Sequence, residues 1–204
     1  TGTATEEGSA EGAESSTGSG EVVAPPGASA DQPYLELSTS DDGPVVDVYL
    51  DFLCPHCQTF EATQGPDLQE MAEAGEITLR MHPRPMLDAT SSPAGYSGRA
   101  ANAALCAAAE DPANWYPASA ALFAQQPGSA GLPDEELIGI VGEATSVDIS
   151  DCQAGGTYLP WLEQVVEPEA QQAVPGTPAV LIDGEQFSGD LTSSGSVRKA
   201  VEAA

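Results

Sequence analysis

Along this chain, short runs of strand-forming residues flank a long stretch with helical periodicity. The clearest strand pattern is the apolar run that starts at Val45 and ends in Asp51-Phe52, after the turn-forming Asp41-Asp42-Gly43-Pro44. Asp183-Gly184, between two later strand-like runs, is a strong hairpin signal. The strands expected from these patterns are residues 34–37, 45–52, 77–81, 179–182 and 186–187.

Helical periodicity accounts for most of the remaining chain. Gly65-Pro66 should kink the first helix, and Gly75 should end it as a C-cap. Asp111-Pro112 predicts a helix start, because Asp is a good N-cap and Pro suits the first helical position. The helices expected are residues 58–74, 100–109, a helix from 112, 134–142, 151–172 and 192–203. From 93 to 173 the pattern is helical and too long for a simple loop.

The composition limits the classes of partner. The chain has 204 residues with 32 acidic and 5 basic side chains, a net charge of −27. Such a field repels nucleic acids and anionic membranes, so neither is expected as a partner. No apolar run reaches the eighteen or so residues that a membrane span needs, and no signal peptide is visible. Residues 1–31 are rich in Gly, Ser, Thr, Ala and Glu, which predicts a flexible tether, the alternative being a segment without function.

The candidate chemistry is Cys54-Pro55-His56-Cys57, which follows the apolar strand and opens a helix. Two cysteines at this spacing lie close enough to bridge, and a helix N-terminus favours a thiolate. Pro55 suits the first turn, and His56, when cationic, would further favour the thiolate of Cys54. We expect Cys54 to be the nucleophile at the exposed front of the helix and Cys57 the resolving thiol. A stabilised thiolate favours the reduced form, so the disulfide should be oxidising.

The other metal-binding or nucleophilic side chains suggest no competing site. Cys106 and Cys152 are too far apart in the sequence to give the second ligand pair of a zinc site, so no metal is expected. Both lie in helices that should pack together, and a stapling disulfide is favoured over two free thiols. His82 follows a strand and precedes a proline, which favours a structural or surface role. No cofactor is expected beyond the redox-active Cys54–Cys57 disulfide itself.

Cys54-Pro55-His56-Cys57 together with the later Gly176-Thr177-Pro178 resembles the motif pair of the DsbA-type thiol–disulfide oxidoreductases. The resemblance extends from about Tyr34 to the C-terminus. It implies an α/β thioredoxin fold, a central mixed sheet flanked by helices, interrupted by an all-helical insertion. The expected organisation is a tether at 1–31, the first half of the thioredoxin fold at 32–92, the insertion at 93–173 and the second half at 174–204.

The resemblance also implies how substrates bind. In thioredoxin-like proteins the proline matching Pro178 is cis and faces the dithiol, and the backbone of the residue before it, here Thr177, pairs with the substrate chain. Such strand pairing tolerates many sequences. The expected substrates are reduced or unfolded secreted and envelope proteins, with a membrane or soluble redox partner for reoxidation. The expected location is extracytoplasmic, either tethered through an N-terminal anchor outside this chain or secreted. No dimerisation segment is evident, so a monomer is expected.

Two features depart from the family pattern. Strong oxidases of this type carry Val where this chain has Thr177, and isomerase-like relatives also carry Thr. The carboxylate that the family places six residues before the first cysteine is replaced by Val48. Asp47 and Asp51 flank Val48, but strand alternation predicts that both point to the opposite face, so neither is expected to be catalytic.

The favoured function is a disulfide oxidase. An isomerase or a reductase is the alternative in the same class, because the residues do not fix the direction of exchange. A metal-binding protein and a chaperone-like envelope protein are the alternatives from other classes.

Overall fold

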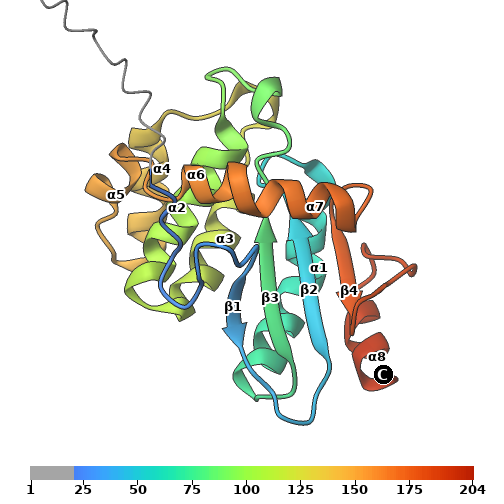
Figure 1. Ribbon diagram of the computed structural model, residues 1–204. Coiled ribbons are helices and arrows are strands. Elements are labelled where there is room, and N and C mark those ends of the chain that lie inside the picture. The colour runs from blue at the N-terminus through green and yellow to red at the C-terminus, as the bar shows by residue number, and fades with distance from the viewer. Residues whose placement is uncertain (1–20) are drawn as a thin grey trace, which may run out of the picture.

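The computed structural model describes residues 21–204, and residues 1–20 of the expected tether lie outside the described part. Its five strands form one mixed sheet in the order β1-β3-β2-β4-β5 (Figure 1). The central strand β2 runs parallel to β3 and antiparallel to β4, and β1 and β5 pair antiparallel at the two edges. The strands are β1 (Leu35–Ser38), β2 (Val45–Leu50), β3 (Thr78–Pro83), β4 (Ala179–Ile182) and β5 (Glu185–Gln186).

Both faces of the central strand β2 are covered. Val46 and Val48 are fully buried on one face, and Tyr49 is buried on the other. The helix α1 (Pro55–Glu73) and the C-terminal α8 (Ser196–Glu202) lie behind the sheet in Figure 1. The stretch from α6 (Leu159–Trp161) to α7 (Glu167–Ala173) crosses in front of it. This arrangement is the expected thioredoxin-type layering of a mixed sheet between helices.

Of the helical segment between β3 and β4, helices α2 to α5 pack beside one end of the sheet (Figure 1). The longest helix of this segment, α2, is rich in buried alanines, and such small side chains let neighbouring helices approach closely. The helices here are α2 (Tyr96–Glu110), α3 (Trp115–Ala124), α4 (Asp134–Thr145), α5 (Ser150–Ala154), α6 (Leu159–Trp161) and α7 (Glu167–Ala173). Short turns at Asp88–Thr90, Pro112–Asn114 and Gly128–Ala130 are 3₁₀-helical, and Leu162–Val166 is a π-helical segment between α6 and α7.

The single helix expected over 151–172 is wrong. The helix stops after Ala154 because Gly155-Gly156 follows, and Gly156 adopts a positive φ of 54° that ends helical geometry. It resumes at Leu159 and continues to Ala173. Likewise, β2 ends at Leu50 rather than at Phe52, because Asp51 begins a turn in which the Cys54 N–H donates to the Asp51 carbonyl at 3.1 Å.

A buried polar cluster attaches α7 to the sheet. His82 on β3, whose side chain is only 2 % exposed, has Nε2 2.7 Å from Asp47 Oδ1 and Nδ1 3.3 Å from Glu169 Oε2. The ring of Tyr49 stacks on His82, and the Tyr49 hydroxyl donates to Glu169 Oε1 at 2.9 Å. Nearby, the Arg84 guanidinium donates two hydrogen bonds to the Glu167 carboxylate, at 2.9 and 2.7 Å. The cluster fixes the helix that leads into Thr177.

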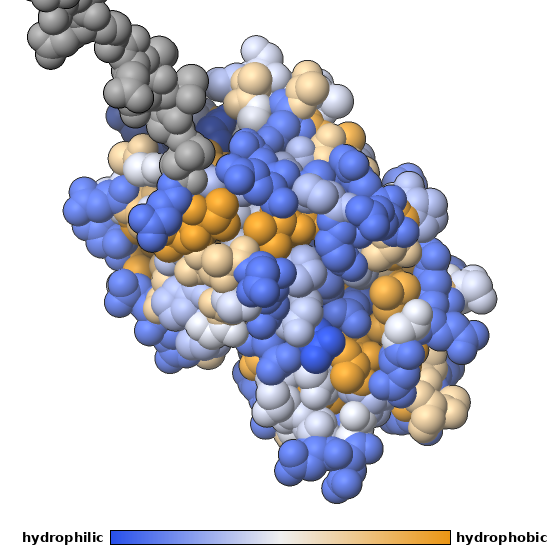
Figure 2. All heavy atoms as spheres, in the orientation of Figure 1, coloured by the Kyte–Doolittle hydropathy of each residue, from blue (hydrophilic) through white to orange (hydrophobic). Residues whose placement is uncertain are grey.

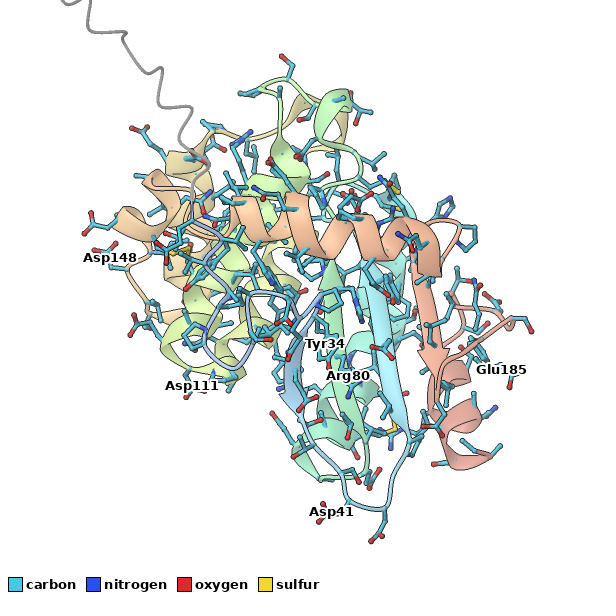
Figure 3. All side chains as sticks on the ribbon, in the orientation of Figure 1. Tyr34, Asp41, Arg80, Asp111, Asp148 and Glu185 are labelled. Atoms are coloured by element: carbon cyan, nitrogen blue, oxygen red, sulfur yellow. A yellow bond between two sulfur atoms is a disulfide. The ribbon has the colours of Figure 1, made fainter. Side chains whose placement is uncertain are left out.

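The surface is predominantly polar. On the face shown in Figure 2, hydrophilic residues predominate and apolar residues gather in separate patches. On the exposed side of β1 and β3, the Arg80 guanidinium lies 4.5 Å from the centre of the Tyr34 ring (Figure 3). Within residues 21–204, no helix combines the length and apolar character that crossing a membrane would require.

Candidate active site

The dithiol lies where β2 passes into α1. Cys54 is the N-cap residue of α1 and Cys57 is in its first turn, so the two sulfurs lie over the positive end of the helix. Pro55 occupies the first helical position, as expected. Both cysteines are reduced, and Cys57 is completely buried.

Cys54 is more covered than the sequence suggests. Its residue is only 7 % exposed, whereas the prediction placed it at the exposed front of the helix. Two long-range contacts cover it. The Thr177 carbonyl lies 3.7 Å from Cys54 Sγ, and the Gln126 side chain donates to the Cys54 carbonyl at 3.0 Å. Cys54 is still the more accessible of the two thiols, so it remains the sulfur that an incoming thiolate can reach.

The two thiols have opposite acidities. The Cys57 side chain donates a hydrogen bond to the Cys54 sulfur, and this contact, which outweighs the opposing effect of burial, lowers the Cys54 pKa to about 5. The main-chain N–H groups of Cys57 and His56 and the Thr177 side chain lower it further. Burial raises the pKa of Cys57 above its ordinary value, and its hydrogen bond to Cys54 adds to that rise. Cys54 is therefore a thiolate at neutral pH while Cys57 keeps its proton.

His56 contributes through its main chain. Its residue is exposed, and the group that stabilises the Cys54 thiolate is its backbone N–H. The expected action of its imidazole on the thiolate stays a prediction.

The second motif lies against the dithiol, although 123 positions separate Cys54 from Thr177. The two meet because β2 and β4 are antiparallel neighbours: Tyr49 near the end of β2 pairs with Ala179 at the start of β4. The loop before β4 therefore reaches the same end of the sheet as the loop after β2. The Thr177–Pro178 peptide bond is cis.

Asp51, which is not expected from the sequence to be catalytic, lies beside the dithiol. The residue is fully buried, and its main-chain N–H lies 3.5 Å from Cys57 Sγ. Its Oδ1 accepts hydrogen bonds from the Leu53 N–H at 2.8 Å and the Ser97 hydroxyl at 2.6 Å. Its Oδ2 accepts from the Leu87 N–H at 2.9 Å. The carboxylate thus ties the loop before Cys54 to the segment after β3 and to α2 of the helical region.

The strand-alternation argument does not apply to Asp51, because β2 has already ended at Leu50. The available signal was an acidic residue at the end of an apolar run, directly before the Cys54 turn. Burial raises the Asp51 pKa to about 6, against the lowering effect of its three hydrogen bonds, and the nearby Cys54 charge adds to the rise. Asp47, the other flanking acid, contacts His82 and not the dithiol.

Cys106 and Cys152 belong to the helical region and not to the site. They form a disulfide between α2 and α5, with an S–S distance of 2.04 Å. Across residues 21–204, no group of three or more His, Cys, Asp or Glu side chains is arranged to hold a metal ion.

Comparison with known proteins agrees with this geometry. A family model described as thioredoxin matches residues 40–203, most of the chain. The chain belongs to the thioredoxin family. The reduced disulfide bond oxidoreductase DsbG of Mycobacterium tuberculosis is 27% identical, with a TM-score of 0.71, over 85% of this chain and 88% of that one. No curated protein gives a significant match.

Two further solved structures show the same fold. Reduced DsbA of M. tuberculosis is 29% identical, with a TM-score of 0.66, over 78% of this chain and 86% of its own. MdbA of Corynebacterium diphtheriae, a thiol-disulfide oxidoreductase, is 22% identical over 79% of this chain and 85% of its own, with a TM-score of 0.68. By its structure, this family member is a DsbA-like thiol–disulfide oxidoreductase.

Proposed function

We propose that this DsbA-like protein is an oxidase that introduces disulfides into secreted or envelope proteins through Cys54–Cys57. The observation that carries the proposal is the difference in acidity between the two thiols. A thiolate at Cys54 stabilises the reduced dithiol, so the corresponding disulfide is a strong electron acceptor.

The proposed reaction is two successive exchanges. A client thiolate attacks Sγ of Cys54, the Cys54–Cys57 bond breaks, and Cys57 leaves and takes up a proton. The client's second thiolate then attacks the client's sulfur in the mixed disulfide, and Cys54 leaves as a stable thiolate. The client loses two electrons and gains a disulfide, while the enzyme gains two electrons and becomes a dithiol. A partner protein that carries a disulfide, membrane-bound or soluble, then reoxidises the enzyme.

Binding of the client main chain is the second part of the proposal. The loop at Thr177-Pro178 lies against Cys54 and offers main-chain groups to an extended client segment. Main-chain pairing suits an enzyme that acts on many unfolded chains. The proposed location is extracytoplasmic, since clients that need disulfides fold in oxidising compartments.

The test is the equilibrium reduction potential of Cys54–Cys57 in glutathione buffers. The proposal expects a value toward that of DsbA, about −120 mV, and well above that of thioredoxin, about −270 mV. A value near the thioredoxin end would identify a reductase and refute the oxidase assignment. The Cys106–Cys152 disulfide must be shown to stay intact at every buffer ratio, so that the titration reports one couple.

A pair of variants tests the roles of the two sulfurs. Cys54→Ser should abolish exchange, whereas Cys57→Ser should keep an accessible thiolate and accumulate a mixed disulfide with the client. If Cys54→Ser kept full activity, the protein would act without redox chemistry, as a chaperone-like binder would.

A further inference from the structure

A groove runs along α1 away from the dithiol. It lies between α1 and α3 and has a volume of about 620 Å³. Gln58, Ala62 and Gly65 line it from α1, and Tyr116, Ala120 and Phe123 line it from α3. Apart from a few polar groups, the walls are aromatic, proline and alanine side chains, which favour apolar occupants.

One end of the groove lies on the helical turn that follows Cys57. Gln58 directly follows Cys57, and its side-chain amide donates to the Phe123 carbonyl at 2.7 Å, which joins the two walls at that end. From Gln58 to Gln69, the last lining residue on α1, the helix rises about 16 Å at 1.5 Å per residue. An extended peptide advances about 3.3 Å per residue, so the groove has room for about five residues.

One acidic side chain lies in this groove without a cation beside it. Glu61 lines the groove, is partly buried, and has a pKa raised by burial to about 7, which the nearby Ser119 side chain partly offsets. Within residues 21–204, no Lys, Arg or His lies at ion-pair distance from Glu61. The four arginines pair elsewhere, with Glu36, Glu167, Asp134 and Asp67. Residues 21–204 therefore leave this carboxylate open to a cation on a bound client.

We propose that the α1–α3 groove binds the client segment next to the reacting cysteine, and that it selects apolar segments carrying a Lys or Arg opposite Glu61. The proposal rests on the proposed function, since it names the clients of the same dithiol. The charge of the groove and the net charge of −27 act in the same direction: both attract cationic segments and repel acidic ones.

Peptide thiols provide the test. Each peptide has one cysteine and five further residues, Leu and Ala around a central Lys or Glu, and is made in both chain directions. Stopped-flow fluorescence at pH 8 gives the rate at which each peptide reduces the Cys54–Cys57 disulfide, relative to the rate with dithiothreitol. The Lys peptide should react about tenfold faster than the Glu peptide in at least one chain direction.

The variants separate the groove from the overall charge. Glu61→Gln should reduce the Lys-to-Glu ratio to about two, whereas Glu143→Gln, the same charge change at an exposed site on α4, should keep the wild-type ratio. Ala62→Trp, which fills the groove, should slow both peptides at least fivefold relative to dithiothreitol. An unchanged ratio in Glu61→Gln, or unchanged peptide rates in Ala62→Trp, would overturn the proposal.

Failure of the proposed function gives a different result. If the potential of the dithiol is that of a reductase but the Lys peptide is still preferred, the oxidase assignment fails and the groove assignment holds. If the potential is oxidising but the wild-type protein does not distinguish the two peptides, only the groove assignment fails.

Discussion

Removal of the Cys106–Cys152 disulfide should destabilise the protein without changing its fold. The bond closes a segment with a sequence separation of 46, from the C-terminal half of α2 to α5. In the folded protein α5 keeps other attachments: Gln153 accepts from Asn102 at 2.8 Å and donates to Asp134 at 2.9 Å. The variant Cys106→Ala/Cys152→Ala should therefore lose mainly the constraint on its unfolded chain.

The magnitude follows from loop closure. For a closed loop of this length, the chain-entropy relation gives a loss of about 4 kcal/mol in the free energy of unfolding at 25 °C. At about 2–4 °C per kcal/mol for a protein of this size, the midpoint of thermal unfolding should fall by about 8–16 °C. The urea m-value should rise, because the unfolded chain without the cross-link exposes more surface.

Urea unfolding followed by circular dichroism and by the fluorescence of the buried Trp115 and Trp161 measures the loss. The comparison uses a background in which Cys54 and Cys57 are both Ala, so that only one disulfide differs between the two proteins. An unchanged midpoint and m-value would refute the loop-closure reasoning. Loss of the native circular dichroism spectrum in the absence of urea would show that the bond is needed for the folded state itself.

Three further variants test the site and its supports. Thr177→Val removes the hydroxyl that helps lower the pKa of Cys54, so the midpoint of the thiolate absorbance at 240 nm should move to a pH above 5. An unchanged titration curve would show that the hydroxyl does not affect the Cys54 pKa. Asp51→Asn places a donor against the Leu87 N–H, so the free energy of unfolding should fall by about 1–3 kcal/mol in urea titrations, and a neutral result would contradict the role of that contact. Burial lowers the pKa of His82, but Asp47 and Glu169 outweigh burial and raise that pKa overall. Protonated His82 therefore stabilises the fold fully below about pH 6.5, and this stabilisation is lost as the pH rises through the higher pKa of the folded state. His82→Gln should flatten that part of the stability profile, and an identical pH dependence in the variant would refute the assignment.

The sequence was sufficient for the parts of the site that depend on local geometry. Cys54-Pro55-His56-Cys57 starts a helix because Pro55 suits the first position. The positive end of that helix then stabilises a thiolate on the nearest cysteine. The strand before it was predictable from its apolar run, although β2 ends two residues earlier than expected. The glycines after Ala154 were visible in the sequence, but helical periodicity on both sides concealed the break.

Tertiary contacts decided which polar side chains are buried and what each of them contacts. Alternation could not place Asp51, because β2 ends at Leu50 and the Asp51 carboxylate is held by the Ser97 and Leu87 donors, which come from other segments. The burial of His82 depends on α7, almost ninety residues later, which supplies Glu169. In the sequence Glu61 is an ordinary acidic residue of a helix, and only the packing of α3 against α1 places it in a groove.

The sequence by itself determined a strand, a turn and a helix start around the Cys54–Cys57 dithiol, because neighbouring residues specify these features. The thioredoxin-type fold was implied by the resemblance of the two motifs to DsbA-type proteins. The tertiary structure decided how acidic each thiol is and what covers it. Those properties depend on burial and on hydrogen bonds from segments that meet only when β2 and β4 pair, and no local pattern encodes them.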